Sequence, residues 1–225
     1  MKVYTHFKDN INLDNHSYEY RWRTILQFGS SWEIIGSVVM KNPGSANYIN
    51  GNNHWIEDQN ILAHLELLDY HRDLENGEKW YEFHSDATME CVAELFAQKM
   101  NVSNKNDLQG VVQIFNLFYL REQNLGKAIK INREIPYAKE IDDKIFEDDI
   151  RALRPPVYLG FGKLAKSSLF REKASLFFYE VLKTCNASYL DSAFDNNRFY
   201  HPLALMRFRK NELKYSIIRE KFCSL

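Results

Sequence analysis

The chain lacks the residues that define several specialised classes of protein. It has three cysteines among its 225 residues, Cys91, Cys185 and Cys223, and none of them is part of a Cys-x-x-Cys motif. We therefore expect neither a disulfide framework nor a zinc or iron–sulfur site, and a reducing compartment fits best. Residues 1–6 lack an apolar signal core, and no apolar run approaches the roughly 20 residues of a membrane span. These absences predict a cytoplasmic protein that contacts no membrane.

A strong charge of one sign is also missing. Lysine and arginine together number 29, aspartate and glutamate number 30, and the formal net charge is -1. No uniform field therefore draws the protein to nucleic acid, and any contact with DNA must use a local patch. The hydrophobic fraction of 45% and aromatic fraction of 14% are enough for a packed core. We expect one globular domain over residues 1–225.

Apolar runs alternate with segments of helical periodicity. Strands are predicted at 23–28, 34–40, 111–115, 156–162 and 188–190. Helices are predicted at 56–70, 87–99 and 168–184, with Asp86 capping the second and a further helix beginning near Ala204. Such alternation predicts an α/β fold of three layers, α/β/α, whose central sheet is mainly parallel.

Residues 48–83 stand apart from this alternation. The stretch is rich in aromatic and polar residues and is broken by Gly77 after its one predicted helix. We interpret it as an insertion beside the site predicted next.

Three polar residues lie at or near the ends of predicted strands or in a late loop. Asn42 follows the first buried run, Asn116 ends the second, and His201 lies in the loop at 199–203. Open α/β sheets build their sites at the carboxyl edge, so these side chains are expected to meet there. Each also has an ordinary explanation: Asn42-Pro43-Gly44 is a common turn, Asn116 can cap a strand end, and His201 can be a simple loop histidine.

Other site classes fit less well. His64 and His71 flank Glu66, but a seven-residue interval is wrong for an HExxH zinc site. The segment at 160–163 lacks the first glycine of a phosphate-binding loop. We expect no metal and no cofactor.

Four short motifs resemble those of a known superfamily. They are Met40-Lys41-Asn42-Pro43-Gly44-Ser45-Ala46, Asp86-Ala87-Thr88, Phe115-Asn116-Leu117-Phe118 and His201-Pro202-Leu203. In this order they resemble the uracil-DNA glycosylase superfamily, closest to a bacterial family of unknown function with an Asn-Pro-Ser turn and a late His-Pro-Leu. The resemblance covers roughly residues 22–207. The chain departs from the family pattern at three places. Lys41 stands where the family has an apolar residue, Ala87 replaces a proline, and residues 48–83 form a longer connection than the family's usual one.

The resemblance implies a role for each of the three polar residues. Asn42 would hold the attacking water through its amide oxygen, which orients the water without accepting its proton. His201 would donate a hydrogen bond to the departing base as negative charge develops there. Asn116 would read the base edge, because an amide offers both a donor and an acceptor.

A flipped base also needs a stacking surface, a wedge and phosphate contacts. Tyr48 is the first choice for stacking, with Pro43, Gly44 and Ser45 beside the substrate. Leu203 is the candidate wedge, with Leu205 or Met206 as alternatives, and the ordinary explanation for these residues is packing at a helix start. The predicted phosphate contacts are Arg207, Arg209, Lys210, Lys163 and Lys166. The alternative explanation is that these residues are ordinary surface charges in contact with solvent, which bind no ligand.

The sequence thus predicts a metal-independent DNA glycosylase that removes a flipped pyrimidine and leaves an abasic site. Because residues 48–83 can enlarge or reshape the pocket, we expect a bulky or modified pyrimidine, including the hypermodified cytosines of phage DNA, which would make the protein a defence factor. Two alternatives stay open. One is a non-catalytic module that binds a nucleotide, a nucleic acid or a protein, and the other is a hydrolase of small N-glycosides.

Overall fold

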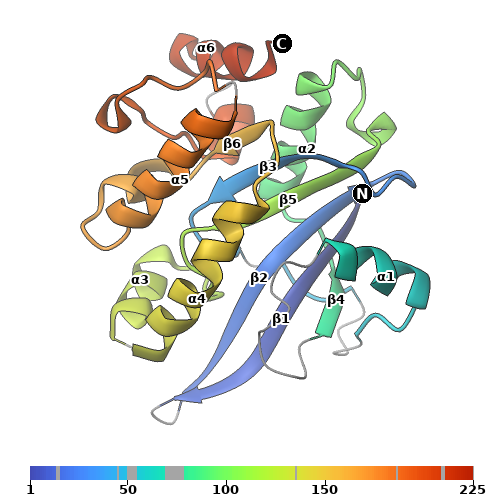
Figure 1. Cartoon of the computed structure of the whole chain (residues 1–225), viewed down its shortest axis with the longest axis vertical. Coiled ribbons are helices and arrows are strands. Elements are labelled where there is room, and N and C mark those ends of the chain that lie inside the picture. The colour runs from blue at the N-terminus through green and yellow to red at the C-terminus, as the bar shows by residue number, and fades with distance from the viewer. Residues whose placement is uncertain are drawn as a thin grey trace.

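The structure is a computed structural model that describes residues 1–13, 16–44, 46–49, 55–68, 79–134, 136–185, 187–208 and 211–224. Its strands form one six-stranded sheet in the order β4-β1-β2-β5-β3-β6 (Figure 1). The strands are β1 (Lys2–Leu13), β2 (His16–Phe28), β3 (Ile34–Met40), β4 (Lys79–Phe83), β5 (Gly110–Asn116) and β6 (Val157–Leu159).

The sheet is mixed, so the predicted mainly parallel arrangement is wrong. Strand β3 runs parallel to both β5 and β6, as expected. In contrast, β1 is antiparallel to β2 and β4, and β2 is antiparallel to β5. The long β1–β2 hairpin explains the difference, because a hairpin joins antiparallel strands directly and needs no crossover helix. The sequence prediction recognised only the end of this hairpin, at residues 23–28.

Helices cover both faces of the sheet, which is compatible with three α/β/α layers. Along β3, Val38 and Met40 face one side and Val39 the other. The Val38 side packs against α2 (Ala87–Lys99) and α6 (Leu213–Cys223). The Val39 side packs against α3 (Leu125–Glu134), α4 (Pro136–Ala152) and α5 (Arg171–Thr184). Figure 1 shows α4 and α5 in front of the sheet and α2 behind it.

Helix α2 begins and ends where the sequence predicts. Asp86 caps it: its Oδ1 accepts hydrogen bonds from the backbone N–H groups of Thr88 and Met89, each at 2.9 Å. An aspartate in extended conformation at this position satisfies amide groups that have no partner within the helix. The predicted cap is confirmed, and it fixes one oxygen of the Asp86 carboxylate.

Two predicted elements near the C-terminus differ. Residues 188–190 form a turn instead of a strand. The Tyr189 side chain nevertheless forms hydrogen bonds with the backbone of the edge strand β6. Its hydroxyl donates to the carbonyl oxygen of Val157 and accepts from the N–H of Leu159, both at 2.9 Å. The helix expected near Ala204 is a single π-helical turn, Ala204–Phe208.

The described parts of residues 48–83 are built into the domain. They include α1 (Gln59–Leu67), which packs through Leu65 on Tyr4 and Ile25, and β4, which pairs with β1. The end of this stretch is therefore an edge strand of the main sheet.

Candidate functional site

A cavity of 180 Å³ opens at the carboxyl ends of β3 and β5, on the face covered by α2. Asn42, Asn116 and His201 all line it. The structure thus brings together three side chains from distant parts of the sequence, at the sheet edge where open α/β folds bind ligands. The other lining residues are Arg21, Thr24, Met40, Lys41, Pro43, Gly44, Asp86, Thr88, Met89, Ile114, Gln123 and Leu125.

The Asn42 side chain is held in one orientation. Its Nδ2 donates to the carbonyl oxygens of Pro43, at 3.1 Å, and Glu122, at 3.0 Å. Both partners are acceptors, so the NH₂ group must face them. The amide oxygen of Asn42 is left to accept a hydrogen bond from another group.

Asn116 is buried at the end of β5, opposite Met40 in the parallel ladder. Only 2% of its surface is exposed, and its Oδ1 has no hydrogen-bond partner among the described residues. A buried polar atom without a partner costs about 1–3 kcal/mol. Because Asn116 lines the cavity, a ligand with a hydrogen-bond donor would remove this cost.

His201 is a neutral hydrogen-bond donor in this environment. Burial, and then the positive charge of Lys41, lower the pKa of His201 to about 4. Its Nδ1 accepts a hydrogen bond from the N–H of Leu203 at 3.4 Å. In a neutral imidazole the other nitrogen then carries the proton, so Nε2–H is the group available for donation.

Arg21 is another buried polar residue of the cavity, and the sequence does not predict it. Arg21 is 3% exposed, its Nη1 donates a long hydrogen bond of 3.5 Å to the carbonyl oxygen of Ala46, and its Nε has no partner in the described structure. Burial lowers the pKa of Arg21 to about 10, against the influence of Asp86 and together with that of Arg121.

A bulge in β2 turns Arg21 toward the cavity. Thr5 of β1 pairs with Thr24, but His6 pairs with Trp22, so Arg23 is an extra residue in β2. Arg23 has a φ of 47°, a left-handed conformation that non-glycine residues seldom adopt. In a regular strand Arg21 and Thr24, three residues apart, would face opposite sides of the sheet. The bulge places both in the cavity lining.

Asp86 and Lys41 supply the remaining charges of the lining. The Asp86 carboxylate lies against the Asn-Pro-Gly turn, where a Cβ on Gly44 would be 2.7 Å from Oδ2. Lys41 is half-buried and passes close to Gly162, where an added Cβ would lie 3.4 Å from Cε; burial lowers its pKa. Asp86 belongs to the motif Asp86-Ala87-Thr88, but the only role that the sequence predicts for it is the cap of the helix.

The predicted stacking residue does not line the cavity. Tyr48 packs its ring on Phe7, Tyr81 and Phe83, with centroid separations of 5.2, 5.4 and 4.7 Å. None of the described lining residues is a phenylalanine, tyrosine or tryptophan. The apolar surface comes instead from Met40, Met89 and Ile114, and methionine sulfur packs well against rings.

The other predicted substrate and wedge residues are divided. Pro43 and Gly44 line the cavity, whereas Leu203 packs against the core on the α2 face and Ser45 lies outside the described residues. The packing of Leu203 matches the alternative explanation offered for it, a contact at the start of a helical turn.

The predicted phosphate contacts lie on the surface. Arg207 makes a two-pronged ion pair with Glu94, and Lys166 donates to the carbonyl oxygen of Asp195 at 2.7 Å. Lys163 is exposed, and Arg209 and Lys210 lie outside the described residues.

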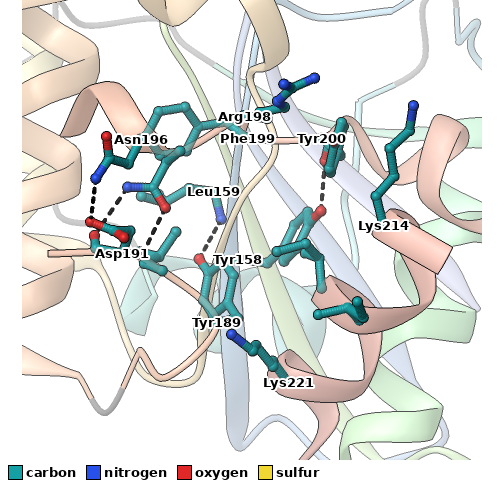
Figure 2. Close-up of a pocket in the computed structure, with 14 residues that line it drawn as sticks. Tyr158, Leu159, Tyr189, Asp191, Asn196, Arg198, Phe199, Tyr200, Lys214 and Lys221 are labelled. Carbon is teal, nitrogen blue, oxygen red and sulfur yellow. Dashed lines mark hydrogen bonds between the residues drawn. The ribbon is translucent and has the colours of Figure 1, made fainter. Parts of the chain in front are cut away.

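A second cavity, of 420 Å³, lies between β6 and α6 (Figure 2). Its inner polar groups bond to one another or to the backbone: Tyr158 donates to the carbonyl oxygen of Tyr200 at 2.6 Å, and Asp191 accepts from Asn196 at 3.0 Å. Its cations, Arg198, Lys214 and Lys221, are exposed at the rim. We place the functional site in the smaller of these two cavities. Arg21 and Asn116 in its lining have buried polar atoms without hydrogen-bond partners in the described structure, whereas no described residue lining the larger cavity has one.

The described residues contain no group of three or more histidine, cysteine, aspartate or glutamate side chains arranged to hold a metal ion. No described helix has the length and apolar character needed to cross a membrane. The chain matches no family model, no curated protein and no solved structure. Function is therefore inferred from the geometry of the cavity.

Proposed function

We propose that the protein is a DNA glycosylase that hydrolyses the N-glycosidic bond of a flipped-out pyrimidine and leaves an abasic site. The observation that carries the proposal is the meeting of Asn42, Asn116 and His201 in one cavity. Their free groups are an acceptor on Asn42, an unpartnered amide oxygen on Asn116 and an N–H donor on His201. These are the groups needed to hold a water, read a base edge and bond to a departing base.

The size of the cavity fits a single ring. A cavity of about 150 Å³ in another protein binds benzene, so 180 Å³ suits one six-membered ring with small substituents. This favours a pyrimidine with a small modification. A glucosylated cytosine would have to extend its sugar out of the cavity. No described residue of 48–83 lines the cavity, and residues 50–54 and 69–78 lie outside the described part.

The reaction follows from the positions of these groups. The C1′–N bond breaks with its electron pair passing to the base, the sugar becomes cationic, and a water oriented by Asn42 forms the new C1′–O bond. His201 donates from Nε2 to the base as its negative charge grows. Neutral His201 suits this role, since its pKa of about 4 keeps it a donor that transfers no proton at physiological pH.

Three free cysteines agree with a cytoplasmic location.

The test is to incubate the protein with duplex and single-stranded DNAs bearing uracil, mispaired thymine, hydroxymethylcytosine or glucosylated hydroxymethylcytosine, and to measure abasic sites. We expect release of at least one base, lost in Asn42→Ala and His201→Ala. Asn106→Ala and His84→Ala are matched controls at exposed positions and should retain activity. Activity on glucosylated DNA would support the role in defence, whereas activity on uracil alone would discard a modified substrate.

The two alternatives predict different results. A non-catalytic binding module releases no base from any substrate, and the two cavity variants change its binding little. A hydrolase of small N-glycosides acts on free nucleosides. Its binding to duplex DNA would be absent or insensitive to salt, whereas contacts to phosphates weaken steeply as salt is added.

A further inference from the structure

The cavity contains a positive charge that the protein itself does not neutralise. Only 3% of Arg21 is exposed, and Asp86 is the one acid whose charge acts on its guanidinium in the described structure, without a hydrogen bond between them. Among the described residues the guanidinium donates one hydrogen bond, of 3.5 Å, to Ala46, its Nε has no hydrogen-bond partner, and its Cζ lies 5.7 Å from the centre of the Phe83 ring. Burying a charge without an ion pair costs several kcal/mol, and the usual remedies are an ion pair or a bound anion.

The charged neighbours leave the balance positive. Asp86, the acid whose charge acts on Arg21, has Oδ1 engaged by two backbone N–H groups. Lys41 adds a second cation to the lining, and His201 is uncharged at neutral pH. Arg121 adds further repulsion from outside the cavity. An anion in the cavity is therefore favoured over a neutral ligand of the same shape.

The backbone supports this interpretation. Arg21 reaches the cavity only because of the bulge at Arg23, where φ is 47°. Strained backbone and buried unpaired charge both lower stability, and proteins retain such features mainly at functional sites. A structural arginine would need neither feature.

We propose that Arg21 binds the departing base and stabilises it as an anion, so that the cavity prefers a negatively charged pyrimidine to a neutral one. This inference rests on the proposed function, because breaking the C1′–N bond sends its electron pair to the base and creates that anion. The water's proton passes to solvent, which later also protonates the released base. Arg21 thus contributes charge stabilisation where His201 contributes a neutral hydrogen bond.

The experiment uses free 5-nitrouracil, whose ring N–H ionises in weakly acidic solution and whose anion absorbs at longer wavelength than the neutral form. The base is titrated spectroscopically with and without excess protein. We expect the pKa of the bound base to fall by about one unit or more, which is a tenfold preference for the anion. An unchanged or raised pKa, or no binding at millimolar base, would overturn the inference.

Three variants identify Arg21 as the source. Arg21→Met removes the charge and keeps the alkyl packing, and it should abolish the shift, whereas Arg21→Lys should keep part of it. Arg121→Met is the matched control, since Arg121 also donates to the carbonyl oxygen of Ala46 but does not line the cavity. It should leave most of the shift in place.

Arg21→Met also separates a binding role from a structural one. If Arg21 serves the ligand, the melting temperature of the free variant should match or exceed that of the wild type, because an apolar side chain removes a buried charge. A large fall in melting temperature would assign Arg21 a structural role and overturn the inference. The titration needs no DNA, so anion binding without abasic sites would refute the glycosylase proposal and leave Arg21 as an anion-binding residue of the cavity. Abasic sites without anion preference would refute only the role of Arg21.

Discussion

The amide nitrogen of Asn42 lies 3.0 Å from the carbonyl oxygen of Glu122, a residue 80 positions further along the chain. This bond joins the turn after β3 to the loop after β5, and so it connects the two strands whose ends carry Asn42 and Asn116. It also fixes which atom of the Asn42 amide is free. The orientation of the proposed water-binding group is thus set by the backbone of a different segment.

Asn42→Asp should therefore be harmful, although a carboxylate is the stronger base. An aspartate cannot donate to the carbonyl oxygens of Pro43 and Glu122, so two hydrogen bonds become repulsive contacts. We expect a loss of about 1–3 kcal/mol of stability by urea unfolding. Single-turnover base release should fall roughly 10²-fold, because the water loses its position. A variant more active than the wild type would show that the amide donors do not orient this side chain.

His201 gives a pH dependence with a defined sign. Its pKa is about 4 in the folded protein, against 6.5 for an unperturbed histidine side chain. Between these values the unfolded chain binds more protons than the folded one, so stability rises with pH there. The contribution is fully present above about pH 6.5 and is lost as pH falls through 4; it amounts to about 3 kcal/mol. Urea unfolding of wild type and His201→Gln from pH 4 to 7 should show a difference that grows with pH.

The same pKa predicts the activity profile of base release. If His201 acts as a neutral donor, activity should persist well below pH 6.5 and fall only as pH approaches 4. The profile is measured with single-turnover assays over the range in which the protein stays folded. A fall centred near pH 6.5 would show that protonation of an ordinary, solvated histidine controls the reaction.

The parts of the site at the ends of apolar runs were predictable from sequence. Asn42 and Asn116 follow strands whose side chains are buried on both faces, and such strands appear as continuous apolar runs. His201 was found through its motif. No single motif indicates that these three residues belong to one site. The order of all four motifs along the chain does.

Arg21 could not be found in this way, for two physical reasons. Strand β2 pairs with antiparallel neighbours. Its alternation of apolar and polar residues indicates a strand, but it does not indicate which other strands β2 pairs with. The bulge at Arg23 then reverses the alternation, so that Arg21 faces the same side as Thr24. Tyr48 shows the opposite error: it is near Asn42 in sequence, but its ring is held by contacts with β1 and β4.

Asp86 has two separable roles, as a helix cap and as a charge beside Arg21. Asp86→Ala should destabilise the protein by about 1 kcal/mol through loss of the cap, whereas Asp86→Asn keeps a good capping residue. In urea unfolding, Asp86→Asn should therefore lie closer to the wild type. Should both variants lose the same stability, the carboxylate charge near Arg21 matters more than the cap.

Gly160, which follows β6, gives the most local test of how the fold places His201. A Cβ on Gly160 would lie 2.8 Å from Cδ of Pro202, the residue after His201, so Gly160→Ala must displace this loop. We expect a loss of about 1–3 kcal/mol in urea unfolding, the usual cost of overpacking, together with reduced base release. Gly126→Ala is the control: it lies in α3, where an added Cβ meets only Asn124 Oδ1, at 3.4 Å. That variant should be neutral or slightly stabilising, because alanine favours a helix. Full activity in a stable Gly160→Ala variant would mean that His201 can shift without consequence, which is incompatible with its proposed contact to the base.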